Sequence, residues 1–345
     1  MKFNSIQYAV FLAAVVAVYW QVPRRARPPL LLLASYAFYA TLGRWFPLLL
    51  IASTGVTYVA AAQIDRAEGT VRRTWLVLGL VGTAGVLVGF KVSAPFLHSQ
   101  ASSFDVASLG ESFAVPAGLS FYTFQAVSHL VDVYRKTSKP CSLLDTALYL
   151  AFFPHLLAGP ILRSRRLVPA FHQERDRPKP AQVREGVELL LTGLFRKVAL
   201  ADPFLAYFPT RMVDQERIGV FNLFLLLCGM IVAVYFDVSA YIDLARGSAK
   251  LLGIDMQPNF AQPLTRSRNW TDFWRRWQIT TMAWFRDYVY APLLGRERGA
   301  GRQAAALMGT FLVVGLWHDV TVNFVIWGVL TGGLLTIEQT LRTRS

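Results

Sequence analysis

The sequence predicts an all-α polytopic membrane protein with about 9–11 transmembrane or re-entrant helices. Of its 345 residues, 54% are apolar or aromatic and 16% are charged, whereas about 25% of a typical soluble domain is charged. Repeated apolar runs approach the roughly 20 residues that a helix needs to cross a bilayer. Charged residues gather in short segments between these runs. These observations exclude a soluble globule, a disordered chain and a secreted disulfide scaffold.

The first apolar run, residues 1–20, predicts a retained membrane anchor. It lacks a small-residue cleavage site, and Arg24, Arg25 and Arg27 follow it, which is the flank order of an anchor and not of a signal peptide. Several further apolar runs are short, which predicts tilted, broken or re-entrant helices. The predicted spans are residues 29–39, 45–62, 75–90, 143–157, 187–208, 220–236, 304–317 and 322–337.

The loop charges predict the topology. By the positive-inside rule the basic segments face the cytoplasm, whereas residues 93–111, which contain no Lys or Arg, face out. The net charge of +14 therefore indicates a basic cytoplasmic face or an anionic partner. No nucleic acid partner is expected, because basic and aromatic residues do not interleave as they do on nucleic-acid-binding surfaces. The basic segments are residues 24–27, 65–73, 135–139, 163–184 and 266–302.

His318 is the leading candidate for chemistry. The predicted helix 304–317 starts after the basic cluster at residues 296–302 and climbs about 21 Å, so His318 lies beyond the midplane of a core about 30 Å thick. Gly315, one turn earlier, is expected to leave a notch beside the imidazole, and Trp317 to exclude water. A neutral imidazole in a dry notch suits a general base. The alternative is a histidine hydrogen-bonded inside a helix bundle.

Two aromatic segments, residues 119–134 and 270–290, carry polar side chains and are expected to lie in the membrane interface or line a polar cavity. In the second, Arg275 and Arg276 would leave the aromatic face and form the mouth for an anionic ligand. Interfacial anchoring is the alternative. The side chains expected on one helical face are Trp270, Phe273, Trp274, Trp277, Thr281, Trp284 and Tyr288.

The other intramembrane ionisable residues are weaker candidates: His129, His155, Asp132, Asp237 and Asp243. His129, His155 and Asp237 are each interpreted as a satisfied interior group. No metal site is expected, because His129 and its helical neighbours offer too few ligands and the two cysteines match no metal spacing.

Six blocks in order along the chain resemble the membrane-bound O-acyltransferase family, and are closest to its bacterial branch of alginate O-acetyltransferases and D-alanyl-lipoteichoic acid transferases. A similar opening, residues 3–5 with 32–39, extends the resemblance from the N-terminus to about residue 337. The blocks are residues 115–125 (VPAGLSFYTFQ), 152–161 (FFPHLLAGPI), 235–241 (YFDVSAY), 273–277 (FWRRW), 284–288 (WFRDY) and 315–318 (GLWH).

The resemblance implies a single domain, 1–345, whose helices enclose a funnel or tunnel with His318 at its depth. It implies a multi-pass enzyme of the bacterial cell (inner/plasma) membrane that transfers an acyl group from a cytoplasmic thioester to a hydroxyl. The donor would be coenzyme A or the 4'-phosphopantetheine of an acyl carrier protein, which is a substrate and not a bound cofactor. The acceptor would be a polysaccharide, teichoic acid, lipid or small molecule. Trp274, Arg275, Arg276 and Trp277 would bind the donor.

The chain departs from the family pattern at Gln278, where the closest relatives usually have a second histidine. Glutamine donates a hydrogen bond but cannot take a proton. We therefore expect one base, His318, with the Gln278 amide meeting the oxyanion. Supporting roles are expected for Trp317, Asn323, Asp237 and Asp243. The chain also lacks the C-terminal helices of many relatives. A smaller acceptor, a missing partner protein or a truncated chain would each explain this difference.

Two other functions remain open at this point. A proton-coupled transporter would also place Asp237, Asp243, His129 and His318 in membrane helices, although no inverted repeat is visible. A catalytically inactive family member that only recruits a partner would be consistent with Gln278 in place of a second histidine.

Overall fold

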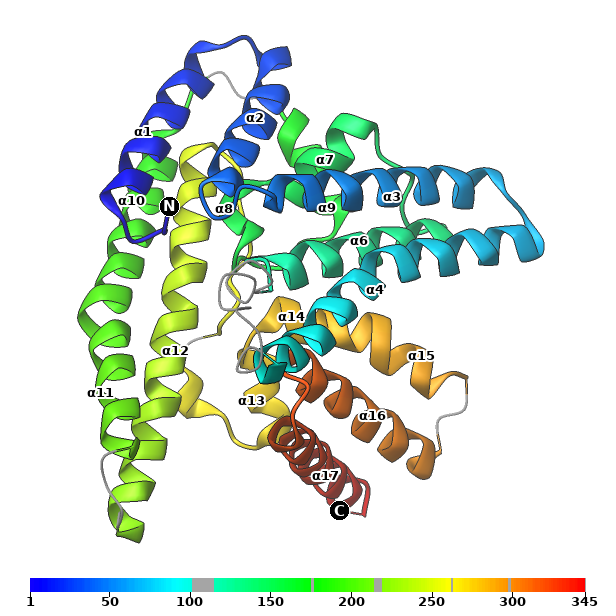
Figure 1. Ribbon diagram of the computed structural model, residues 1–345, viewed down its shortest axis with the longest axis vertical. Coiled ribbons are helices and arrows are strands. Elements are labelled where there is room, and N and C mark those ends of the chain that lie inside the picture. The colour runs from blue at the N-terminus through cyan, green and yellow to red at the C-terminus, as the bar shows by residue number, and fades with distance from the viewer. Residues whose placement is uncertain (101–114, 175–176, 214–218, 262, 297–298, 345) are drawn as a thin grey trace. The chain divides into compact units, whose positions relative to one another are not determined.

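The computed structural model describes residues 1–100, 115–174, 177–213, 219–261, 263–296 and 299–344. These residues form helices and no strand (Figure 1), which confirms the all-α prediction. The chain forms two compact units, one of Met1–Leu50 with Leu144–Pro258 and one of Ile51–Leu143 with Asn259–Ser345. That all of them make one functional domain stays a prediction.

The first unit is built around an antiparallel helix pair, α10 and α12. Gly193 and Gly247 let the two backbones touch, because a Cβ on Gly193 would lie 2.9 Å from the Ala240 carbonyl oxygen. The helices of this unit are α1 (Ile6–Gln21), η1 (Arg24–Ala26), α2 (Arg27–Ala40), α7 (Leu143–Ala151), α8 (Phe153–Leu156), α9 (Ser164–His172), α10 (Pro180–Phe195), the π-helical η2 (Arg196–Ala201), α11 (Asp202–Val213) and α12 (Val220–Leu251).

Two of the spans predicted in this unit are broken helices, as the short apolar runs led us to expect. The span predicted at 143–157 is two short helices, α7 and α8, separated just before Pro154, which is tolerated in a first turn but not in a helix interior. The basic segment 163–184 contains α9 and the start of α10. The span at 187–208 is interrupted by the π-helical turn η2. Residues 101–114, most of the segment expected to face out, lie outside the described residues.

Helix α12 changes character along its length. Its first half exposes large apolar side chains, among them Val220, Phe221 and Ile231, whereas its second half is buried from Ser239 to Lys250. The buried half carries Asp243, which pairs with Arg196 of η2. The first half is thus suited to lipid and the second to protein contact.

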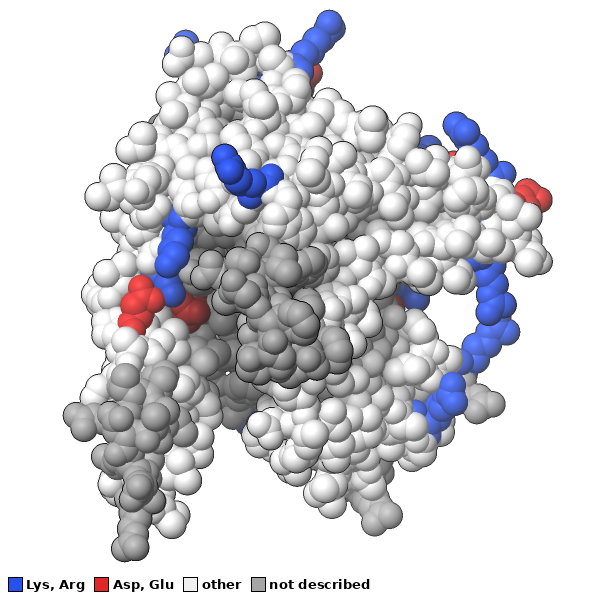
Figure 2. All heavy atoms as spheres, in the orientation of Figure 1, with Lys and Arg blue, Asp and Glu red and all other residues white. Residues whose placement is uncertain are grey.

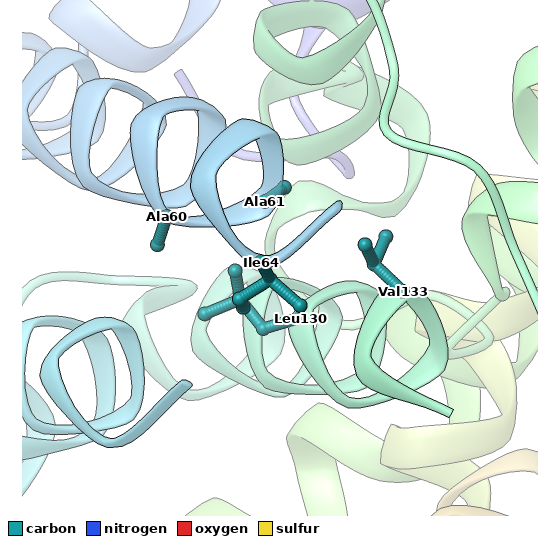
Figure 3. Packing of buried hydrophobic residues seen from close by; sticks show 5 residues of the cluster. All are labelled: Ala60, Ala61, Ile64, Leu130 and Val133. Carbon is teal, nitrogen blue, oxygen red and sulfur yellow. The ribbon is translucent and has the colours of Figure 1, made fainter. Parts of the chain in front are cut away.

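The second unit holds the residues singled out for chemistry. Its core lies where Ala60, Ala61 and Ile64 of α3 face Leu130 and Val133 of α6 (Figure 3). The helices are α3 (Phe46–Arg66), which begins in the first unit, α4 (Gly69–Gln100), α6 (Leu119–Tyr134), α13 (Trp270–Arg276), α14 (Ile279–Phe285), the π-helical η4 (Arg286–Tyr290), α15 (Ala291–Leu294), α16 (Ala300–His318) and α17 (Val322–Arg344).

Four helices of the described chain are long and apolar enough to cross a membrane: Phe46–Arg66, Gly69–Ser93, Val220–Leu251 and Val322–Arg342. Uncharged residues dominate the face shown in Figure 2, where Lys and Arg appear at a few places only. Because these four helices have the length and apolar composition of membrane spans, the chain is an integral membrane protein.

Candidate functional site

His318 is the last residue of α16 and lies among aromatic rings. Its ring centroid is 4.6 Å from that of Trp317, 5.5 Å from that of Phe324 and 5.6 Å from that of Trp327. The Phe324 ring stacks on the imidazole, with 20° between the planes. Phe324 and Trp327 belong to α17, so the α16–α17 pair builds this environment.

Lys91 of α4, which the sequence analysis missed, fixes the end of α16. Its Nζ donates a hydrogen bond to the His318 carbonyl oxygen at 3.1 Å, and a cation is favourable beside the unsatisfied carbonyls of a helix C-terminus. Helix α4 rises about 28 Å from Arg72 to Lys91 at 1.5 Å per residue. His318 therefore lies beside the end of α4 that is remote from the basic residues Arg72 and Arg73.

The expectation of a dry notch at Gly315 is wrong. A Cβ on Gly315 would meet the Phe324 carbonyl oxygen, so the backbone of α17 already fills this space. The side chain of His318 is exposed at the surface of the described residues. Gly315 thus sets how closely α16 and α17 approach, and the expected notch beside the imidazole does not form.

The segment 270–290 is not one helix with a single aromatic face, as expected. Helix α13 ends at Arg276, and α14 starts at Ile279. Between them Gln278 adopts the left-handed conformation, with φ 47° and ψ 51°. This costs a non-glycine residue about 1–2 kcal/mol and breaks the helix. Contacts with the surrounding residues must maintain it.

Those contacts come from Asn259, which is buried and which the sequence analysis did not identify. The Gln278 Oε1 accepts hydrogen bonds from Asn259 Nδ2 at 2.6 Å and from Thr281 Oγ1 at 3.3 Å. Asn259 Oδ1 accepts the backbone N–H of Thr280 at 2.6 Å and its hydroxyl at 2.8 Å. The Asn259 carbonyl oxygen accepts the Ile279 N–H at 2.8 Å.

The helices on both sides of Gln278 reach the aromatic residues around His318. Trp274 of α13 contacts Trp327, with ring centroids 6.1 Å apart, and Phe285 of α14 contacts Trp317 at 5.7 Å. Within the described residues no hydrogen bond or ring contact joins Gln278 to His318 directly. A molecule that reacts with both would have to lie between them.

Helix α6, the first aromatic segment, holds α14 and η4 in place. Trp284 Nε1 donates to the Phe124 carbonyl oxygen at 2.8 Å, and the Tyr288 hydroxyl donates to Asp132 at 2.7 Å. Arg135, just after α6, donates to the Asp287 carbonyl oxygen at 3.1 Å. Asp132 thus positions an aromatic side chain of η4.

A cavity of about 570 Å³ adjoins α13 and α14. Arg275 is exposed on its wall and makes no hydrogen bond or ion pair with any described residue. The indole Nε1 of Trp274 is buried on the same wall and likewise lacks a hydrogen-bond partner among these residues. The rest of the lining mixes apolar and polar side chains. The apolar ones are Ile279, Met282, Ala283, Phe285, Leu307, Phe311 and Leu335, and the polar or charged ones are Thr271, Arg286, Tyr290, Thr310, Gln339 and Arg342.

The other two predicted donor-binding residues face elsewhere. Arg276 pairs with Asp272 at 3.1 Å. The pKa of the Asp272 carboxyl lies below its usual value, first because it accepts the Arg268 backbone N–H and then because Arg276 donates to it. Trp277 stacks on Phe273, with ring centroids 5.6 Å apart. Neither Arg276 nor Trp277 lines the cavity.

Of the four predicted supporting residues, all of which the structure describes, one contacts His318 and three do not. Trp317 contacts His318, whereas Asn323 is exposed in the first turn of α17 and makes no hydrogen bond among the described residues. Asp237 and Asp243 belong to the first unit, where Asp237 pairs with Lys197 at 2.6 Å and Asp243 pairs with a cation of η2.

The two weaker histidine candidates are both buried, His129 in α6 and His155 in α8. Across the described ranges no three His, Cys, Asp or Glu side chains group as metal ligands would.

Comparison with known proteins identifies the family. The family model for the membrane-bound O-acyltransferase family matches residues 42–345. The probable alginate O-acetylase of Pseudomonas aeruginosa is 35% identical over 99% of this chain and 66% of its own length. The peptidoglycan O-acetyltransferase of Helicobacter pylori is 29% identical over 90% of this chain and 64% of its length.

A more distant relative is the teichoic acid D-alanyltransferase of Bacillus subtilis, 28% identical over 64% of this chain and 58% of its length. The chain spans about two thirds of the length of the alginate relatives that it matches. The six sequence blocks, the membrane helices and the family model agree, and the chain belongs to the membrane-bound O-acyltransferase family.

Proposed function

We propose that this chain is a membrane-embedded acyltransferase that moves an acyl group from a thioester to a hydroxyl, with His318 as general base. The observation that carries the proposal is the geometry of His318. The histidine of the family block ends α16 with an exposed imidazole that is packed on Phe324 and held near Trp327. An exposed but oriented imidazole suits proton abstraction from a bound hydroxyl.

The proposed reaction is direct transfer. The imidazole of His318 takes the hydroxyl proton while the hydroxyl oxygen attacks the thioester carbonyl carbon. The N–H groups of Gln278 stabilise the resulting oxyanion. The carbon–sulfur bond then breaks, the imidazolium gives this proton to the leaving thiolate, and the ester and the free thiol leave.

The donor is proposed to bind in the cavity beside α13 and α14. Neither His318 nor Gln278 lines this cavity, so the thioester end of the donor would extend out of it toward them. Arg275 has no partner of its own there, and Arg286 and Arg342 lie on the same wall. Guanidinium groups suit the phosphates of coenzyme A or of carrier-bound 4'-phosphopantetheine. The apolar part of the lining suits the rest of such a donor, which would approach from the basic, cytoplasmic side.

The acceptor is proposed to be a hydroxyl of a cell-envelope polymer, and the location to be the bacterial inner membrane. The relatives are named for transfer to alginate, peptidoglycan and teichoic acid. Two of these names specify acetyl transfer, so acetyl is the first acyl group to test.

The test is acetyl transfer by the purified protein in detergent, from labelled acetyl-coenzyme A to alginate oligosaccharides. His318→Ala should lower the rate by about 10²–10⁴-fold, the usual contribution of a general base, without changing yield or thermal stability. His172→Ala is the matched control, because His172 is an exposed histidine of the first unit that pairs with Asp145. A His318→Ala rate within a few-fold of the parent would contradict the assignment.

A further inference from the structure

We infer that Asn259 is a positioning residue that orients the side-chain amide of Gln278, so that its NH₂ group and not its oxygen faces the reacting carbonyl. The inference rests on the proposed acyltransfer and names a residue that acts through Gln278.

Asn259 caps α14 from outside the helix. The first N–H groups of a helix need acceptors, and a residue at the position of Gln278 commonly supplies one from its own side chain. The Gln278 side chain makes no such bond. Instead the Asn259 carbonyl oxygen and Oδ1 accept the N–H groups of Ile279 and Thr280. This arrangement releases the Gln278 side chain for another task.

The hydrogen bonds allow one orientation of both amides. A backbone N–H only donates, so the Asn259 atom 2.6 Å from the Thr280 nitrogen must be the oxygen. The other end of the Asn259 amide is then an NH₂, which donates to the Gln278 atom 2.6 Å away. That atom must be Oε1, and the Thr281 hydroxyl donates to it as well. Amide orientation is normally inferred from such networks.

The Nε2 of Gln278 consequently points away from Asn259 and has no hydrogen-bond partner among the described residues. Asn259 is 1% exposed, so the amide that donates to Oε1 is held inside the protein. The left-handed backbone at Gln278 further limits where the amide can lie. Two N–H donors are thus fixed before any substrate binds, which is what stabilising an oxyanion requires.

Asn259→Asp reverses this orientation with little change of shape. The new carboxylate still accepts both bonds from Thr280 but cannot donate to Gln278. The Gln278 amide then turns to donate its own NH₂ to that carboxylate, which leaves its oxygen facing the developing oxyanion. We expect kcat for acetyl transfer from acetyl-coenzyme A to alginate oligosaccharides to fall about 10²-fold, as on loss of an oxyanion donor, while KM for the donor stays within about 2-fold.

Gln278→Glu is the companion variant, because it keeps the acceptor for Asn259 but has no N–H to donate. It should lower kcat to a similar extent, and the double variant of Asn259→Ala with Gln278→Glu should be little slower than either single one, since both changes remove the same interaction and no second carboxylate is added beside Gln278→Glu. Asn269→Asp is the matched control: Asn269 Oδ1 only accepts the Asp272 N–H, at 2.8 Å. A carboxylate caps a helix as well as an amide does, so this variant should match the parent.

The outcomes distinguish the role of Asn259 in orienting Gln278 from the role of Gln278 in acyl transfer. An unchanged rate in Gln278→Glu would refute the role of Gln278 itself. A slow Gln278→Glu with a fast Asn259→Asp, or fully additive losses, would overturn the positioning role of Asn259. If Asn259→Asp lowers the melting temperature in detergent, Asn259→Ala decides: a fall in kcat with unchanged KM supports the inference, and parental kcat refutes it.

Discussion

Gly328→Ala tests whether the close approach of α16 and α17 sets the position of His318. A Cβ at Gly328 would lie 2.6 Å from the Phe311 carbonyl oxygen and 3.1 Å from the Leu312 Cα. Carbon and oxygen normally stay about 3.3 Å apart even in close contacts. Helix α17 must therefore move about 0.7 Å away from α16, which is 3.3 minus 2.6 Å.

This movement should cost activity more than stability. Phe324 and Trp327 of α17 contact the imidazole of His318 on α16, so separating the helices displaces the base from its neighbours. A misplacement of about 1 Å can cost 10²-fold in rate, and we expect kcat to fall about 10-fold or more. Overpacking costs about 1–3 kcal/mol, but alanine regains about 1 kcal/mol of helix propensity, which leaves a small net loss.

The assay is acetyl transfer with thermal unfolding in the same detergent. Gly333→Ala is the control on the same helix, since its Cβ would have Met308 Cε at 3.9 Å as its nearest neighbour, an ordinary contact. It should keep the parental rate and gain up to about 1 kcal/mol of stability. If Gly328→Ala turns over as fast as Gly333→Ala, the helix contact does not control His318.

The remaining predictions concern Arg275 and Lys91. Arg275→Gln should raise KM for acetyl-coenzyme A several-fold and weaken its dependence on ionic strength, because exposed charges act over a Debye length of about 8 Å at physiological salt. Arg276→Gln should change neither KM nor its salt dependence, since Arg276 pairs with Asp272. If the two variants change KM equally, both arginines are better explained as lipid anchors. Lys91→Met should lower kcat with little change in donor KM by freeing the end of α16, and a parental kcat would show that this bond does not position His318.

The fold class and the position of His318 at the end of a helix could be predicted from sequence, because both depend on local signals. Apolar runs of membrane length specify helices whatever surrounds them, and the block around His318 is contiguous. The conformation of Gln278 could not be predicted. Its left-handed backbone is maintained by Asn259, 19 residues away in sequence, and glutamine has no intrinsic preference for that region.

Gly315 and Arg276 show the same limit at other positions. A glycine in an apolar helix permits either an open notch or a backbone contact, and only the position of α17 decides between them. The adjacent arginines Arg275 and Arg276 look equivalent in sequence. The helix turns one toward the cavity, while Asp272, four residues before Arg276, pairs with the other.

The change of character along α12 relates the protein to the thickness of its bilayer. The apolar, exposed part from Val220 to Phe236 rises about 25 Å at 1.5 Å per residue, somewhat less than an average hydrocarbon core of about 30 Å. Asp237 and its Lys197 partner follow at once. In a thick, sterol-rich bilayer this ion pair would lie closer to the hydrocarbon core, whereas in a thin bilayer it would lie at the level of the headgroups. The length of this apolar part therefore matches a bilayer somewhat thinner than average better than a thick one.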